Sequence, residues 1–200
     1  MIIRKHLKVL ATLLLATQAF AGTNATNTNT VSPTLKVSVT VQSAIQLTLA
    51  TGTGCTVTAG GGTDYAISFG NVDAMGINAP SCGNKFLPTT PGSTNAAYYT
   101  DYTLTPIFTS QSVSTNTITA YVSSNFAKAN LSIVQNNSSP ASIANLTAMS
   151  TSAGAPTSVA TNATNGTTIT RYIGVSIAPT NAAGLTGADS ATITYTLTVQ

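Results

Sequence analysis

The sequence predicts an all-β chain with an immunoglobulin-like antiparallel β-sandwich. Threonine makes up about a fifth of the chain and favours strands, while the many asparagines and glycines favour turns. The apolar residues occur in short runs that alternate with polar residues, and none of these runs has helical periodicity. Seven or more such strands separated by turn signals are typical of a sandwich. We therefore expect residues 35–200 to form a single β-sandwich domain.

Residues 1–21 have the layout of a secretory signal peptide. A basic start, "MIIRKHLK", precedes the apolar run "VLATLLL" and the ending "AFA". This apolar run is shorter than the roughly 20 residues of a membrane-spanning helix. We expect the mature chain to have no membrane span, to pass through a periplasm, and to reach the cell surface or the extracellular medium.

The charge of the expected mature chain is close to zero. The full sequence has a formal net charge of +3, but three of its seven basic residues lie in the signal peptide. Nucleic-acid binding therefore lacks the clustered basic residues on which it depends. Four basic residues remain against four acidic ones: Lys36, Lys85, Lys128 and Arg171 against Asp64, Asp73, Asp101 and Asp189.

Residues 22–34, "GTNATNTNTVSPT", form a polar low-complexity segment that we expect to be a flexible leader. A strand pattern follows in "LKVSVTVQSAIQLTL", where apolar residues recur with a period of two and only Ser43 interrupts them. The alternating apolar residues are Leu35, Val37, Val39, Val41, Ile45, Leu47 and Leu49.

The rest of the chain carries further strand and turn signals. Pro106 is expected on an edge or at a bulge, because proline donates no ladder hydrogen bond. Asn165-Gly166 predicts a type I′ turn. Residues 136–166 predict long loops with one weak strand or helical turn. Strands are expected at 64–70, 98–109, 116–124, 129–135, 167–179 and 190–200.

The only two cysteines, Cys55 and Cys82, could bind a metal, exchange electrons or form a structural disulfide. The chain has no CxxC motif and no histidine after the signal peptide, so a zinc site is poorly supported. An exported chain meets an oxidising compartment, where a disulfide fits better. Such a bond would stabilise the fold by roughly 3.5 kcal/mol in the chain-entropy model. We expect no metal and no cofactor.

Catalytic side chains are scarce. Without histidine or glutamate in the mature chain, a general base could come only from four separated aspartates, which are more typical of turns and strand edges. A calcium loop of the D-x-D-x-D-G type is absent. We therefore predict no catalytic residue and no enzyme activity.

Three tyrosines, Tyr98, Tyr99 and Tyr102, offer a second interpretation. Together they could form a platform on which a sugar stacks, although tyrosine at strand positions more often packs in a core or across strands. The alternative function is therefore a surface adhesin or a carbohydrate-binding module.

The stretches "CTVTA" and "ISFGNVD", the second cysteine and the alternating strand that runs to the C-terminus resemble the spore coat protein U and chaperone–usher pilin group of secreted subunits. The resemblance places Cys55 and Cys82 at the family's disulfide positions and Phe69-Gly70 at its Phe-Gly. It implies an incomplete immunoglobulin-like sandwich that a neighbouring subunit or a chaperone completes with a donated strand.

The resemblance also implies a function and partners. The function would be that of a non-catalytic structural subunit of a pilus, a coat or another cell-surface assembly. The partners would be copies of the chain or related subunits, with a periplasmic chaperone and an outer-membrane usher.

A physical argument supports strand addition independently. A sandwich that lacks a strand exposes apolar side chains and unpaired backbone groups, and an alternating segment can satisfy both. The segment at 35–49 is the candidate for this exchange. Insertion into its own domain and insertion into a neighbour both remain open, and its direct connection to Cys55 makes its own domain the default.

Overall fold

The computed structural model describes residues 36–39, 45–58, 65–109, 116–179 and 187–199. The chain divides into two compact units, Met1–Val41 and Gln42–Gln200. In the first unit the described residues form no helix or strand, and Val37 and Val39 are 82% and 83% exposed. The predicted signal peptide and the predicted leader lie outside the described residues.

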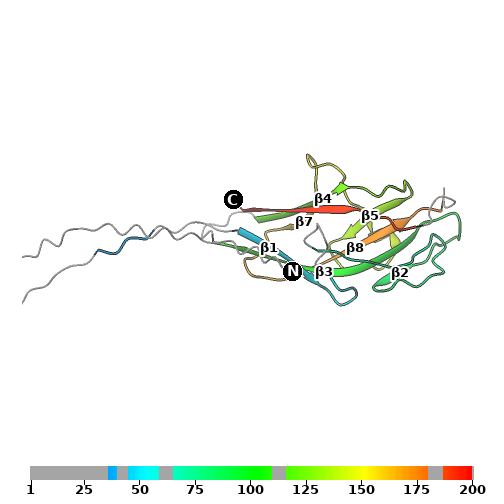
Figure 1. Ribbon diagram of the computed structural model, residues 1–200, viewed down its shortest axis with the longest axis horizontal. Helices are drawn as coiled ribbons and strands as arrows, with labels where there is room; N and C mark the ends of the chain where they lie inside the picture. Colours follow the sequence, from blue (N-terminus) through cyan, green and yellow to red (C-terminus); the bar gives the residue numbers. More distant parts are fainter. Residues whose placement is uncertain (1–35, 40–44, 59–64, 110–115, 180–186, 200) are drawn as a thin grey trace, which may run out of the picture. The chain divides into compact units, whose positions relative to one another are not determined.

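The second unit consists of two antiparallel sheets packed together, which confirms the all-β prediction (Figure 1). A six-stranded sheet has the order β1-β3-β8-β5-β6, with β2 also paired to β3. A three-stranded sheet has the order β7-β4-β9. The elements are β1 (Ile45–Thr51), β2 (Asn84–Phe86), β3 (Ala96–Phe108), β4 (Asn116–Ser124), β5 (Leu131–Asn136), the 3-10 turn η1 (Ile143–Asn145), β6 (Thr147–Ala148), β7 (Thr157–Thr161), β8 (Ile169–Ile177) and β9 (Thr192–Val199).

Strand β3 is the long central strand of the six-stranded sheet. Along one edge it pairs with β8 over residues 96–104. Its other edge is shared, because β2 pairs with residues 97–99 and β1 pairs with residues 102–108. Alternate side chains of a strand point to opposite faces, so β3 presents its even-numbered residues to the space between the sheets. These even positions are among the most buried in the chain: Ala96, Tyr98, Thr100, Tyr102, Leu104, Pro106 and Phe108.

The main core lies between the two sheets. Strand β4 alternates in the same way as β3 and buries Ile118, Ala120 and Val122 against it. Val159 of β7 and Ile173 of β8 belong to the same cluster of buried side chains. Burying one such aliphatic side chain contributes about 1.5–3 kcal/mol, so this cluster is the main source of stability.

Polar contacts also join the two sheets inside this core. The hydroxyl of Tyr195 in β9 donates to the hydroxyl of Tyr102 in β3 over 2.9 Å, and their rings meet edge to face with centroids 5.9 Å apart. The Nε of Arg171 in β8 donates to the carbonyl of Val159 in β7 over 2.6 Å. Burial raises the pKa of Tyr102 to about 12, although the Tyr195 hydroxyl and the nearby Arg171 charge act in the opposite direction.

Five of the strands predicted from the sequence form close to the expected positions: β3, β4, β5, β8 and β9. Two predictions at the start of the domain are wrong in extent. The segment 64–70 forms no strand in its described part, only an isolated bridge between Ala66 and Thr58. In the alternating segment at 35–49, the described residues form a strand from Ile45 onward, and residues 36–39 form none.

The segment 136–166 is more structured than predicted. It contains η1, β6 and β7, and the β7 residues Val159 and Ala160 are buried. Strand β7 escaped prediction because its sequence, "TSVAT", contains only two apolar residues and these are adjacent rather than alternating. A register shift between Ile118 and Thr119 of β4 accommodates this strand.

Two turn-related predictions have different outcomes. Thr167 donates to the carbonyl of Thr164 and closes a turn, but only Gly166 has a positive φ, at 71°. A type I′ turn also needs a positive φ at Asn165, so that prediction is wrong and the pattern is that of a type II turn. Pro106 lies beyond the β8 pairing and, among the described residues, has a strand partner only in β1, which confirms its edge position.

The Tyr102–Tyr195 contact generates a stability prediction. Tyr102→Phe leaves the buried Tyr195 hydroxyl without its acceptor, so we expect a loss of about 1–3 kcal/mol in the free energy of unfolding. Tyr102→Phe/Tyr195→Phe removes both partners and should recover most of that loss. Urea denaturation of the two single variants and the double variant measures the coupling; strictly additive losses would contradict it.

The Tyr102–Tyr195 pair also predicts that the folded domain loses stability at alkaline pH. A raised pKa means that the folded state holds the Tyr102 proton more tightly than the unfolded state, whose tyrosines ionise near pH 10. Stability is therefore complete below about pH 10 and falls as the pH rises toward about 12. Urea denaturation across this range should show a shallower decline for Tyr102→Phe than for the wild type, and equal slopes would contradict the assignment.

Candidate functional site

The two cysteines form a disulfide at the point where the shared edge of β3 changes partner. The Cα atoms of Cys55 and Cys82 are 5.1 Å apart, and Cys55 is 1% exposed. Cys55 follows β1 and Cys82 precedes β2, so the bond ties the two strands that pair with the same edge. The predicted disulfide between Cys55 and Cys82 is confirmed.

Asp101 of β3 stabilises the same region, where β1 and β2 meet on the edge of β3. Its carboxylate accepts hydrogen bonds from the Thr53 N–H at 2.7 Å, the Thr53 hydroxyl at 2.9 Å and the Gly54 N–H at 2.8 Å. Burial alone would raise the pKa of Asp101, but these hydrogen bonds outweigh it and hold the pKa below its ordinary value. Gly54 is required here, because a Cβ at this position would lie 2.5 Å from the Thr100 hydroxyl oxygen.

Asp73 holds a second loop, residues 73–78. Its carboxylate accepts hydrogen bonds from the backbone N–H groups of Met75, Ile77 and Asn78. Burial acts to raise the pKa of Asp73, but these N–H groups together lower it. The Lys85 ammonium donates to the carbonyls of Gly76, at 2.6 Å, and Asn78. The Asp73 carboxylate and the Lys85 ammonium therefore both stabilise the conformation of this loop.

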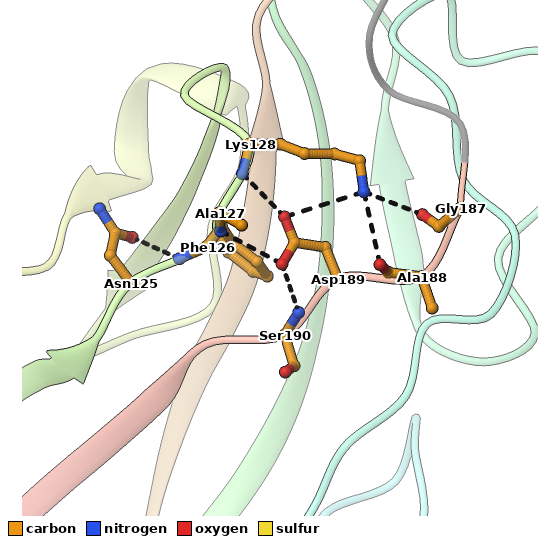
Figure 2. A network of polar contacts seen from close by, with 8 residues as sticks. All are labelled: Asn125, Phe126, Ala127, Lys128, Gly187, Ala188, Asp189 and Ser190. Carbon is orange, nitrogen blue, oxygen red and sulfur yellow. Dashed lines mark hydrogen bonds and ion pairs between the residues drawn. The ribbon is translucent and has the colours of Figure 1, made fainter.

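Asp189 joins the segment before β9 to the segment after β4 (Figure 2). Its carboxylate accepts hydrogen bonds from the N–H groups of Ala127 at 3.2 Å and Lys128 at 2.9 Å. The Lys128 ammonium donates to the carbonyls of Gly187 and Ala188 and lies 4.0 Å from the carboxylate. The N–H of Lys128 is the main cause of a lowered pKa at Asp189.

The three described aspartates thus share one role. Each carboxylate accepts hydrogen bonds from several backbone N–H groups of a loop, and these bonds hold its pKa below the ordinary value. Asp64, the fourth, lies outside the described residues. In the described ranges, no group of three or more histidine, cysteine, aspartate or glutamate residues is placed to hold a metal ion.

The structure does not bring the three tyrosines of the predicted platform to one face. Tyr98 points into the sandwich, where its hydroxyl donates to the carbonyl of Asp73 at 2.9 Å. Tyr102 also points inward, to Tyr195. Tyr99 alone lies on the outer face of the six-stranded sheet, where it stacks on Phe86 with ring centroids 4.8 Å apart.

The edge strands β1 and β9 leave part of the core open. Each pairs with a single strand among the described residues, β1 with β3 and β9 with β4, and the two are not paired with each other although they approach closely. The core-facing side chains of both strands are only partly buried, in contrast to those of β3 and β4. We define the open edge by these residues: Leu47 and Leu49 of β1 with Ile193, Tyr195 and Leu197 of β9.

The opposite side of the sandwich is closed. There β7 covers the core with Val159 at 1% and Ala160 at 5% exposure, and Met149 before it is equally buried. Burial on this side is therefore deeper than along β1 and β9, although Ile133 of β5 and Ile169 of β8 are also only partly buried.

The sequence pointed to only half of the open edge. The alternating segment at 35–49 included Leu47 and Leu49, and the structure places both there. The β9 residues were predicted as a strand but not as part of a site. The alternation of apolar residues near the end of the chain was the available signal for these residues. That β9 pairs with β4 and with no other described strand could be learned only from the tertiary structure.

Comparison with family models, curated proteins and solved structures finds no match for this chain. Among the residues that the structure describes, no helix is long and apolar enough to cross a membrane.

Asp101→Asn tests the junction between β1 and β2. An amide replaces one acceptor oxygen by an NH₂ group that faces a backbone N–H, so we expect a loss of about 1–3 kcal/mol in the free energy of unfolding at pH 7. The stabilisation exists above the unfolded pKa of about 3.9 and is lost as the pH falls through the lower, folded pKa. The difference between wild type and variant should therefore shrink below pH 4, and a pH-independent difference would contradict this origin.

Proposed function

We propose that this protein is a non-catalytic, exported structural subunit of a pilus, a coat or another cell-surface assembly, and that its copies associate by β-strand addition. In this proposal the sandwich is immunoglobulin-like and incomplete at the open edge. A strand from a neighbouring copy, or from a related subunit, occupies that edge. A periplasmic chaperone and an outer-membrane usher would serve such a subunit in transit.

The open edge is the observation that carries the proposal. It combines half-buried apolar side chains with two strand edges that have no further strand partner among the described residues. An added strand can bury the side chains and pair the backbone groups at the same time. An uncovered edge of this kind is otherwise a liability for a soluble domain.

The residues before β1 have the chemistry that an added strand needs. Val37 and Val39 are more than four-fifths exposed, and they alternate with Lys36 and Ser38. An alternating segment places its apolar side chains on one face, as insertion over a hydrophobic core requires. Leu35 and Val41 continue the pattern in the sequence and lie outside the described residues.

The remaining chemistry of the domain also favours a structural role. The described aspartates and Lys85 and Lys128 bind backbone groups of loops. Arg171 binds the backbone of β7. Charges that hold loops and strands in place fit a subunit whose function is to keep one shape.

The N-terminal segment provides the direct test. In the mature chain, Val37→Asp/Val39→Asp would place two carboxylates against the core, and burying an unpaired charge is strongly unfavourable. We expect self-association to weaken by at least about 100-fold. Sedimentation velocity with negative-stain imaging measures this, over a concentration series.

Ser38→Asp is the matched control, because it adds a charge to the same segment at a position of the opposite face. It should assemble like the wild type. A wild-type mature chain that remains monomeric at all concentrations, or a double variant that assembles as well as the wild type, would contradict the proposal.

A further inference from the structure

A small cavity opens on the outer face of the six-stranded sheet, the face away from the main core. Its volume is about 240 Å³. Strands β3, β5, β6 and β8 and the turn η1 supply its walls. The lining residues are Asn95, Ala97, Ser132, Val134, Ile143, Leu146, Ala148 and Ser176.

The cavity exists because three small residues lie side by side across the sheet. Ala97 of β3 is opposite Ser176 of β8, which is opposite Ser132 of β5. A row of long side chains would fill this surface, whereas alanine and serine leave a depression. Ile143 of η1 and Leu146 directly after it line the depression and give it depth.

The lining has two chemically distinct parts. Ala97, Val134 and Leu146 form a buried apolar cluster. Asn95, Ser132 and Ser176 form a polar side, in which the Asn95 amide donates to the Ser176 hydroxyl oxygen at 3.2 Å. The Ser132 hydroxyl makes no hydrogen bond within the described part of the chain, so it is free to bind a ligand.

The size and charge of the cavity restrict its ligand. A volume of 240 Å³ is below the roughly 300–1,000 Å³ typical of pockets for drug-sized ligands. No charged side chain lines it, so an ionic group would find no partner. A ring with an apolar face and a rim of neutral hydroxyls matches both the apolar cluster and the polar side.

We propose that this cavity is a binding site for a single ring of a neutral sugar. The apolar cluster would contact the C–H face of the ring, and Asn95, Ser132 and Ser176 would bind its hydroxyls. This site differs from the predicted tyrosine platform, and it lies on the opposite face of the sheet from the open edge. Its occupancy is therefore independent of strand addition.

Titration of the ¹⁵N-labelled mature chain tests the proposal, with glucose, galactose, mannose and N-acetylglucosamine as separate probes. We expect at least one sugar to shift the amide signals of the lining residues, with a Kd of about 1–10 mM for a ligand of this size. Ser132→Leu fills the cavity and should abolish the shifts. Asn95→Ala, at an exposed position, should weaken binding several-fold without affecting the fold.

Ser158→Leu is the matched control, since it makes the same substitution at an exposed position of β7 in the other sheet and should leave binding unchanged. The proposal is overturned if no sugar shifts these signals at tens of millimolar. Shifts that persist in both Ser132→Leu and Asn95→Ala, or that fall elsewhere on the domain, would also overturn it.

Discussion

The edge of β3 that β1 and β2 share is the constraint on which the rest of the domain depends. One strand of 13 residues carries β8 along one side and two short strands along the other. The two short strands meet beside Thr100 and Asp101, where the ladder is interrupted. The disulfide and the Asp101 carboxylate both act at this interruption, and together they hold β1 in register. Strand β1 in turn contributes Leu47 and Leu49 to the open edge.

The few charged residues of this domain mostly bind the backbone of loops, although Asp101 and Lys85 themselves lie in strands. Threonine, serine and asparagine far outnumber the charged residues in the sequence. Each described aspartate replaces the missing regular structure of a loop with several hydrogen bonds to backbone N–H groups. Such charge-assisted bonds are stronger than neutral ones, which suits segments that contain little apolar surface.

The sequence predicted the elements whose signal is local. Alternation located β3, β4, β5, β8 and β9, and the elimination of other cysteine chemistry identified the disulfide. Alternation did not locate β7, which is recognisable only from its pairing with the neighbouring strand β4. It also wrongly predicted a strand at 64–70, where the described residues form only an isolated bridge. A platform of Tyr98, Tyr99 and Tyr102 was only the alternative interpretation, and core packing of strand tyrosines is the more usual one; the period of two sends Tyr98 and Tyr99 to opposite faces.

Sequence analysis predicted part of the open edge because the alternation of its apolar residues lies within one continuous segment. The alternation up to Leu49 was visible, whereas the outer-face cavity depends on cross-strand neighbours such as Ala97 and Ser176, which are far apart in the sequence. The function of Asp101 likewise depends on Thr53 and Gly54, almost fifty residues earlier in the chain.

Amide hydrogen exchange gives the most direct test of the open edge. If a neighbouring copy completes the sandwich, amides of β1 (Ile45–Thr51) and β9 (Thr192–Val199) that face outward should exchange quickly in the monomer and become protected on assembly. Amides of β4, paired on both sides, should be protected in both states. Equal exchange of β1 and β9 before and after assembly would contradict strand addition at this edge.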